Sequence, residues 1–101
     1  MIKLLNSEDN KTEGNLKKTK YLLVILKNGS AISTFATDDT IKRVRKEFEA
    51  KSEKLLEIKG YDAEYYDNGD MDILSSEMIF WSNEMSSIKI LDLNDAPYVE
   101  E

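Results

Sequence analysis

The sequence contains neither cysteine nor histidine among its 101 residues. Because cysteine is absent, disulfide bonds, thiolate metal sites and cysteine nucleophiles are excluded. Because histidine is absent, the chain lacks the side chain that most often transfers protons near neutral pH and most often binds metal ions. These two absences argue against an enzyme.

Glycine and long apolar runs are scarce as well. The four glycines stand far apart, so no glycine-rich loop can surround a phosphate group, and no serine has the flanking glycines of a nucleophile elbow. The apolar start at Met1–Leu5 is too short for a signal peptide or a membrane span, because polar residues follow it at once. We therefore predict a cytoplasmic protein that is not an enzyme and does not bind membranes.

The charges are unevenly distributed along the chain, whose formal net charge is -6. Residues 1–59 contain thirteen Lys and Arg against nine Asp and Glu, whereas residues 60–101 contain eleven acids and a single base, Lys89. Between Gly60 and Ile88 there are seven acids and no base. Such asymmetry predicts a surface that repels nucleic acid and attracts basic partners.

The clearest secondary-structure signal is the strand-forming run Tyr21–Leu26, which Asn28-Gly29 follows. Both turn residues tolerate positive φ, which predicts a two-residue type I′ turn and a second strand at residues 30–36. That turn would place Ile25 opposite Ile32. Because the first strand is apolar on both faces, we expect it in the middle of the sheet.

A long helix is predicted to begin at Thr37 or Asp38, whose side chains can cap free backbone N–H groups. Apolar residues then recur at helical spacing in one narrow stripe, and Gly60 is a natural stop. The stripe consists of Ile41, Val44, Phe48 and Leu55. The other positions carry Lys, Arg and Glu, many in i,i+4 pairs that suit a face in contact with water.

Residues 61–75 permit two interpretations, a tight hairpin around Asn68-Gly69 or an excursion loop. Beyond them, residues 77–81 and 87–93 have the composition of two strands and are predicted to form a hairpin through residues 82–85. The predicted fold is α+β, an antiparallel sheet of four to five strands in the order hairpin, helix, hairpin, with the one long helix packed on one face.

The chain is too short for two hydrophobic cores, so we expect a single domain at residues 20–93. Residues 1–19 are polar and without periodicity, which predicts a tail or linker, with a short strand at residues 2–5 as an option. Residues 94–101 contain the only proline and end in two acids, which predicts an acidic C-terminal tail.

The acidic stretch at residues 62–72 raises the question of a calcium site. An EF-hand loop needs glycine at its position 6 and glutamate at its position 12. A loop beginning at Asp62 has Asp67 where glycine is required, and one beginning at Asp70 has Trp81 where glutamate is required. We therefore predict no metal ion and no other cofactor, with a looser carboxylate site for Mg²⁺ or Ca²⁺ as an alternative.

The same stretch places tyrosines between carboxylates, a composition typical of protein interfaces, because tyrosine supplies contact area at little cost in conformational entropy. We predict a non-catalytic protein-interaction module, a small accessory or regulatory protein whose partner is another protein with a basic surface. One specific hypothesis is an inhibitor that occupies the basic groove of a nucleic-acid-binding protein. The predicted partner-binding residues are Tyr61, Asp62, Glu64, Tyr65, Tyr66, Asp67, Asp70, Asp72, Glu77 and Glu84.

A second interpretation is a structural homo-oligomer. The run Met78–Trp81 is apolar on both faces. In a central strand it would be core and the protein a monomer, whereas at a sheet edge it would leave one face for a second copy of the chain.

Nucleic-acid binding and nuclease activity have weaker support. The bases on the predicted helix are Lys42, Arg43, Arg45 and Lys46, and the neighbouring acids can neutralise them, so we expect no direct contact with nucleic acid. Glu-x-Lys sequences occur at residues 49–51 and 57–59. A metal-dependent nuclease would need such a pair on a strand beside a further acid, whereas we expect both pairs on the helix.

Overall fold

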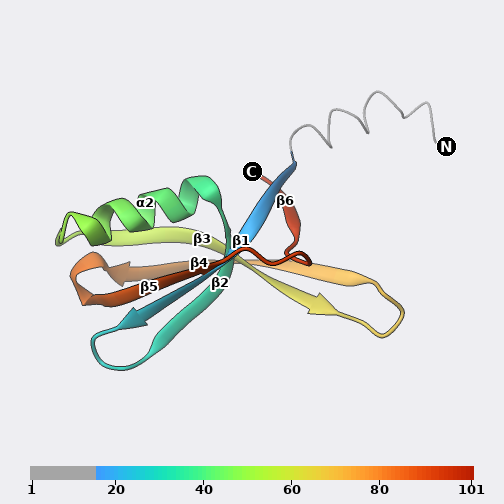
Figure 1. Ribbon diagram of the computed structural model, residues 1–101, viewed down its shortest axis with the longest axis horizontal. Coiled ribbons are helices and arrows are strands. Elements are labelled where there is room, and N and C mark those ends of the chain that lie inside the picture. Colours follow the sequence, from blue (N-terminus) through green and yellow to red (C-terminus); the bar gives the residue numbers. More distant parts are fainter. Residues whose placement is uncertain (1–15) are drawn as a thin grey trace.

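The computed structural model describes residues 16–101, in which an antiparallel sheet and one α-helix form an α+β fold (Figure 1). The predicted strand option at residues 2–5 lies outside the described residues. Between residues 16 and 101, no helix combines the length and the apolar character needed to cross a membrane. The elements are β1 (Leu16–Leu26), β2 (Ala31–Thr37), α2 (Asp38–Glu49), β3 (Leu55–Tyr65), β4 (Met71–Trp81), the 3-10 helix η1 (Ser82–Glu84), β5 (Met85–Leu91) and β6 (Tyr98–Glu100).

The strand order is β4-β3-β2-β1-β5, and β6 pairs with the beginning of β1. The predicted hairpin between residues 77–81 and 87–93 is therefore wrong, because β4 pairs with β3 and β5 crosses to the other side of the sheet. A strand that is apolar on both faces is typical of the middle of a sheet, and β1 takes this position because β2 pairs with one of its edges and β5 with the other. The matching residues of β5 are Ile88 and Ile90, which lie opposite Val24 and Leu22.

The hydrophobic core contains residues from the sheet and from α2. Val44 of the helix and Leu22 and Val24 of β1 are fully buried in one cluster, which Ile58 of β3 joins. Burial of four such side chains contributes on the order of 1.5–3 kcal/mol each. This cluster lies in the half of the sheet beside α2, so the other half of the β3–β4 hairpin has little core beneath it (Figure 1).

The helix ends at Glu49, well before the predicted stop at Gly60. Leu55, expected on the buried stripe, is 49% exposed at the start of β3. In residues 55–59 buried and exposed side chains alternate, which is the period of a strand. The alternating Glu and Lys residues fit this period as well as they fit helical i,i+4 pairs, and the helical prediction overlooked it.

The helix closes with a left-handed residue at Lys51, whose φ is 53°. The Lys51 N–H donates to the Phe48 carbonyl at 3.1 Å, and the Ser52 N–H donates to the Glu47 carbonyl at 3.2 Å. These two hydrogen bonds form a Schellman motif, in which glycine usually occupies the left-handed position. Lysine is strained there, because its Cβ crowds the following carbonyl oxygen.

We expect Lys51→Gly to raise the free energy of unfolding by about 0.5–1 kcal/mol, because glycine adopts positive φ without this crowding. Urea denaturation measures the change. Lys51→Ala is the matched control, since it removes the side chain but keeps Cβ, and it should leave the stability nearly unchanged. Equal stabilisation by both variants would mean that the lysine side chain, and not its backbone, is unfavourable.

The turn between β1 and β2 has a three-residue loop in place of the predicted type I′ turn. Gly29 has a φ of 92°, but Asn28 does not have the positive φ that a type I′ turn also requires. The Asn28 side chain instead accepts a hydrogen bond from the backbone N–H of residue 30 at 2.9 Å, which favours an ordinary turn followed by a glycine bulge. The extra loop residue shifts the register by one, so Ile25 lies opposite Ala31 and not Ile32.

The C-terminal segment, expected as a tail, is part of the fold. Ala96, Pro97 and Val99 are buried, and β6 pairs with residues 16–18 of β1. The Thr19 hydroxyl, itself buried, donates to the Pro97 carbonyl at 2.7 Å. The ordered unit therefore includes residues 16–19 and 94–101 in addition to the predicted domain.

Candidate functional site

The far half of the β3–β4 hairpin extends away from the rest of the sheet (Figure 1). The neighbouring strand β2 pairs with β3 only where Phe35 meets Tyr61. Beyond this point β3 and β4 pair with each other as far as the turn at Asn68-Gly69. The structure therefore shows a hairpin in the region for which the sequence allowed a hairpin or a loop. We call residues 62–75 the hairpin arm.

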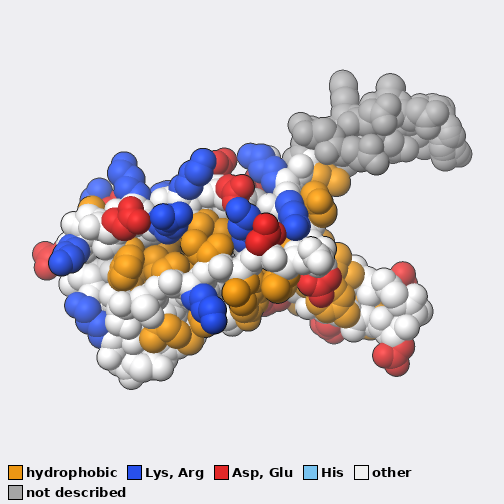
Figure 2. Space-filling view, in the orientation of Figure 1, with side chains coloured by type: hydrophobic (Ala, Val, Ile, Leu, Met, Phe, Trp, Pro, Cys, Tyr) orange, Lys and Arg blue, Asp and Glu red, His pale blue; other side chains and the backbone are white. Residues whose placement is uncertain are grey.

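All the charged side chains of the hairpin arm are acidic. They are Asp62, Glu64, Asp67, Asp70 and Asp72, and all five are exposed. Within the described part of the chain, no Lys or Arg nitrogen lies within 4.0 Å of any of them. On the face that Figure 2 shows, this end of the molecule has acidic and apolar side chains and no basic ones. The arm therefore offers a concentrated negative charge to an approaching partner.

Large apolar side chains are exposed between these carboxylates. They are Tyr65, Tyr66, Met71, Ile73 and Leu74, of which Leu74 is the most exposed at 56%. Their exposure follows from the architecture, because no third strand and no helix of residues 16–101 packs on this part of the hairpin. Clustered apolar groups that a monomer leaves in water often mark an interaction surface.

Two carboxylates on the arm face each other across the strands, since Glu64 lies opposite Asp72. Like charges directly opposite each other destabilise a sheet. The Tyr66 hydroxyl lies between them and donates a hydrogen bond to Asp72 Oδ2 at 2.8 Å, with Glu64 Oε1 at 3.4 Å. This hydrogen bond raises the pKa of Tyr66 above its usual value, and partial desolvation and the Glu64 carboxylate act in the same direction.

We expect Asp72→Asn to lower the pKa of Tyr66 toward the ordinary tyrosine value of about 10, because the amide no longer favours the protonated phenol. The tyrosinate absorbance, or the ring resonances of Tyr66 in NMR, would follow the titration. Since the folded pKa exceeds the unfolded one, the stabilisation is complete below the unfolded pKa and is lost as pH rises through the folded pKa. Asp62→Asn is the control, because Asp62 faces Leu74 and should leave this titration unchanged.

Tyr65 connects the arm to the segment that precedes β6. Its hydroxyl donates to the backbone carbonyl of Asp95 at 2.9 Å. Partial desolvation raises the pKa of Tyr65, and the nearby Asp95 charge raises it further. Asp95 therefore lies beside the acidic arm although it is distant in sequence.

The structure gathers seven of the ten predicted partner-binding residues in one place. These are Asp62, Glu64, Tyr65, Tyr66, Asp67, Asp70 and Asp72, on the hairpin arm or at its turn. The other three lie elsewhere: Tyr61 is only 4% exposed, Glu77 lies on β4 opposite Lys59, and Glu84 lies in η1 at the other end of the molecule (Figure 1). Tyr61 is held inside the fold, where its hydroxyl donates to Glu101 Oε2 at 3.3 Å.

Comparison with known proteins assigns no relative. No protein-family model, curated protein or solved structure matches the chain. The interpretation of the arm therefore depends on its own geometry and charge. The apolar residues Met71, Ile73 and Leu74 were not among the predicted partner-binding residues, because their exposure depends on which elements cover the hairpin and not on their own composition.

The structure changes the placement of one Glu-x-Lys sequence. Residues 57–59 lie on β3, not on a helix, and Lys59 lies opposite Glu77 of β4. Nevertheless, within residues 16–101 no three carboxylates come close enough together to hold a metal ion. We assign no metal centre to this strand pair or to the hairpin arm.

Proposed function

We propose that the protein is a non-catalytic protein-interaction module that binds a basic partner protein through the hairpin arm. The observation that supports this proposal is the arm itself, a strand pair without a third strand or a helix packed on it among residues 16–101. It exposes tyrosine, methionine, isoleucine and leucine between carboxylates that no described lysine or arginine neutralises. Apolar anchors supply most of the binding energy in protein interfaces, and surrounding charges set the association rate and the choice of partner.

A more specific form of this proposal is an inhibitor of a nucleic-acid-binding protein. A basic groove on such a protein attracts phosphates, and carboxylates can occupy the same positive potential. The hairpin arm is only two strands wide, which would let it enter a groove that the whole sheet could not enter. In this form of the proposal, nucleic acid and the arm compete for one surface of the partner.

Affinity capture from a native lysate tests the proposal. The bait is the protein with the arm neutralised by Asp62→Asn, Glu64→Gln, Asp67→Asn and Asp70→Asn, alongside the unmodified protein. The matched control removes the same charge elsewhere through Asp39→Asn, Glu53→Gln, Glu84→Gln and Glu100→Gln. We expect a basic protein, identified by mass spectrometry, on the unmodified protein and the control but not on the neutralised arm. Equal capture by all three baits would contradict the proposal.

A second candidate function is self-association through a sheet edge. Both β4 and β5 are edge strands, and Ile79 and Trp81 of β4 are 55% and 53% exposed. An open edge with exposed apolar residues and no lysine or proline is a site for pairing with another strand. From the sequence, an apolar Met78–Trp81 strand at a sheet edge predicts a homo-oligomer.

If β4 pairs with β4 of a second copy, the protein should be a dimer at tens of micromolar by light scattering. Ile79→Lys should convert the dimer to a monomer, because a charged side chain on an edge strand opposes pairing. The control is Ser87→Lys on the opposite edge strand β5, which should leave the dimer intact. A monomer at this concentration would rule out the candidate.

A further inference from the structure

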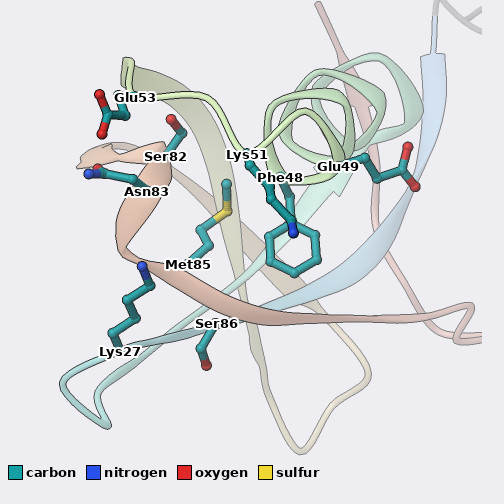
Figure 3. A pocket seen from close by; sticks show the side chains of 9 residues that line it. All are labelled: Lys27, Phe48, Glu49, Lys51, Glu53, Ser82, Asn83, Met85 and Ser86. Carbon is teal, nitrogen blue, oxygen red and sulfur yellow. The ribbon is translucent and has the colours of Figure 1, made fainter.

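A cavity of about 690 Å³ (Figure 3) lies at the end of the molecule opposite the hairpin arm, beside the end of α2 (Figure 1). The end of α2, the loop after it, η1, and the adjoining ends of β1 and β5 surround it. Sites for small organic ligands typically have volumes of roughly 300–1,000 Å³ and combine an apolar wall with a few polar groups. The size and position of this cavity are therefore those of a ligand site, and none of the predicted partner-binding residues except Glu84 lies at this end.

The wall of the cavity includes an extension of the hydrophobic core. Met85 is only 4% exposed and belongs to the buried cluster, and Phe48 packs against that cluster while lining the cavity. An apolar group placed here would leave water on contact with core side chains, which is favourable by about 25 cal/mol for each Å² buried.

Two lysines bring positive charge to this apolar wall. Lys27 follows β1 and Lys51 follows α2, so they reach the cavity from different sides (Figure 3). Among residues 16–101, no carboxylate oxygen lies within 4.0 Å of either ammonium group. An uncompensated pair of cations beside an apolar wall is suited to an anion that also carries an apolar group.

The two glutamates at the rim do not neutralise these lysines. In Figure 3 the side chains of Glu49 and Glu53 point away from the centre of the cavity. The Glu49 carboxylate lies 3.5 Å from Arg45 on the outer surface of the helix. The Ser82 hydroxyl is already used, because it donates to the Ser52 carbonyl at 2.8 Å and accepts from the Lys54 N–H at 2.8 Å.

The backbone supplies an independent observation. Lys51 is the only residue other than glycine with positive φ in the described part of the chain, and it lies at the cavity rim. Glycine would end the helix there without strain. Strained backbone positions of this kind persist only where the surrounding structure holds them, and they cluster at active sites and ligand sites.

We propose that this cavity binds a small amphipathic anion, with an apolar body against Phe48 and Met85 and one carboxylate or phosphate group between Lys27 and Lys51. The ligand is a single small molecule, since the volume of the cavity falls in the range of small-molecule sites. This site is independent of the proposed function, because the hairpin arm lies at the other end of the molecule.

The test is an NMR titration of the ¹⁵N-labelled protein with sodium octanoate, kept below the concentration at which it forms micelles. We expect the backbone amide signals of residues 48–53 and 82–86 to shift and to saturate. Octanol has the same apolar body without charge, and acetate has the charge without the apolar body. Both should bind at least tenfold more weakly than octanoate. Octyl phosphate carries a phosphate group in place of the carboxylate of octanoate, so the tighter of these two ligands identifies the preferred anion.

Variants of the two lysines test the assignment. Lys27→Gln and Lys51→Gln should each weaken octanoate binding about fivefold to tenfold, whereas Lys42→Gln and Lys46→Gln on the outer face of α2 should not change it. Lys51→Gly separates binding from folding, because it should stabilise the protein and still weaken binding. The proposal is overturned if octanol binds as tightly as octanoate, if the shifts do not saturate, or if Lys51→Gly binds octanoate as well as the unmodified protein.

Discussion

Replacing Gly60 by alanine is expected to lower the free energy of unfolding by about 1–3 kcal/mol, the usual cost of forcing extra atoms into a packed interior. A Cβ atom at this position would overlap the Thr34 Oγ1 and Met78 Cε atoms and would lie 2.9 Å from Thr34 Cβ. Gly60 does not have positive φ, so the requirement for glycine is one of space and not of backbone conformation. The flexible end of Met78 can move aside, but Thr34 cannot move without losing hydrogen bonds.

Those hydrogen bonds join the hairpin to the rest of the sheet. The Tyr61 N–H donates to Thr34 Oγ1 at 2.9 Å, and the Thr34 hydroxyl lies 3.2 Å from the Tyr61 carbonyl, to which it can donate. Since β2 and β3 otherwise pair only where Phe35 meets Tyr61, this threonine supplies much of the connection between the two strands. Gly60→Ala should therefore loosen the β2–β3 contact as well as destabilise the core.

Urea denaturation measures the stability loss, and amide hydrogen exchange at residues 61–63 reports the loosened contact. Ser76→Ala is the matched control, since Ser76 lies opposite Gly60 in β4 and the change adds no atoms. Its stability should remain within about 0.5 kcal/mol of the unmodified protein. Unchanged stability in Gly60→Ala would show that Thr34 and Met78 can make room without cost.

Neutralising the hairpin arm is expected to slow association with the proposed basic partner by about tenfold to a hundredfold at low salt, because electrostatic steering raises association rates by factors of this order. The same variant should fold normally, since exposed charges contribute little to stability. Removal of the repulsion between Glu64 and Asp72 should stabilise the folded hairpin only slightly, so urea denaturation should give nearly equal stabilities.

Stopped-flow or surface-binding kinetics at about 0.05 M and 0.5 M salt would separate steering from contact. Added salt shortens the Debye length, from about 10 Å at 0.1 M to about 3 Å at 1 M, and should slow the unmodified protein toward the rate of the neutralised arm. The variant with Asp39, Glu53, Glu84 and Glu100 neutralised should keep most of its association rate. An association rate independent of salt would exclude a steering role for the arm.

The sequence predicted the features that depend on neighbouring residues. The strand at Tyr21–Leu26 and the start of the helix near Thr37 follow from local propensity, although the Thr37 side chain does not make the expected capping hydrogen bond. The turn at Asn68-Gly69 was one of two alternatives that the sequence left open, and the structure shows it. The order of the strands did not follow, because it depends on which distant strand covers the second side of β1. Residues 55–59 were misassigned because alternating Glu and Lys suit both an exposed helix face and an exposed strand face.

The difference between features set by neighbouring residues and features set by distant ones applies to the candidate site as well. The acids of residues 62–72 lie together because one hairpin contains them all, so their clustering could be predicted from proximity in sequence. Tyr61 and Glu84 could not be placed in this way, since burial of the first depends on the C-terminal segment and the position of the second on the path from β4 to β5. The cavity at the other end depends on residues from three separate segments of the sequence and had no sequence signal.

The central position of β1 has a consequence for how the protein is made. During synthesis β1 and β2 emerge first, but the strand that covers the other side of β1 and the segment that pairs with its beginning emerge last. The hydrogen bond between Thr19 and Pro97 joins residues 78 positions apart, which is a contact of high sequence separation in a chain of this size. Contacts of this kind slow folding, because the loop must close before the contact forms. The edge of β1 that pairs with β5 should therefore remain unpaired on the ribosome until β5 has left the exit tunnel. Since β1 is an apolar strand, a chaperone that binds extended apolar segments would meet the nascent chain there.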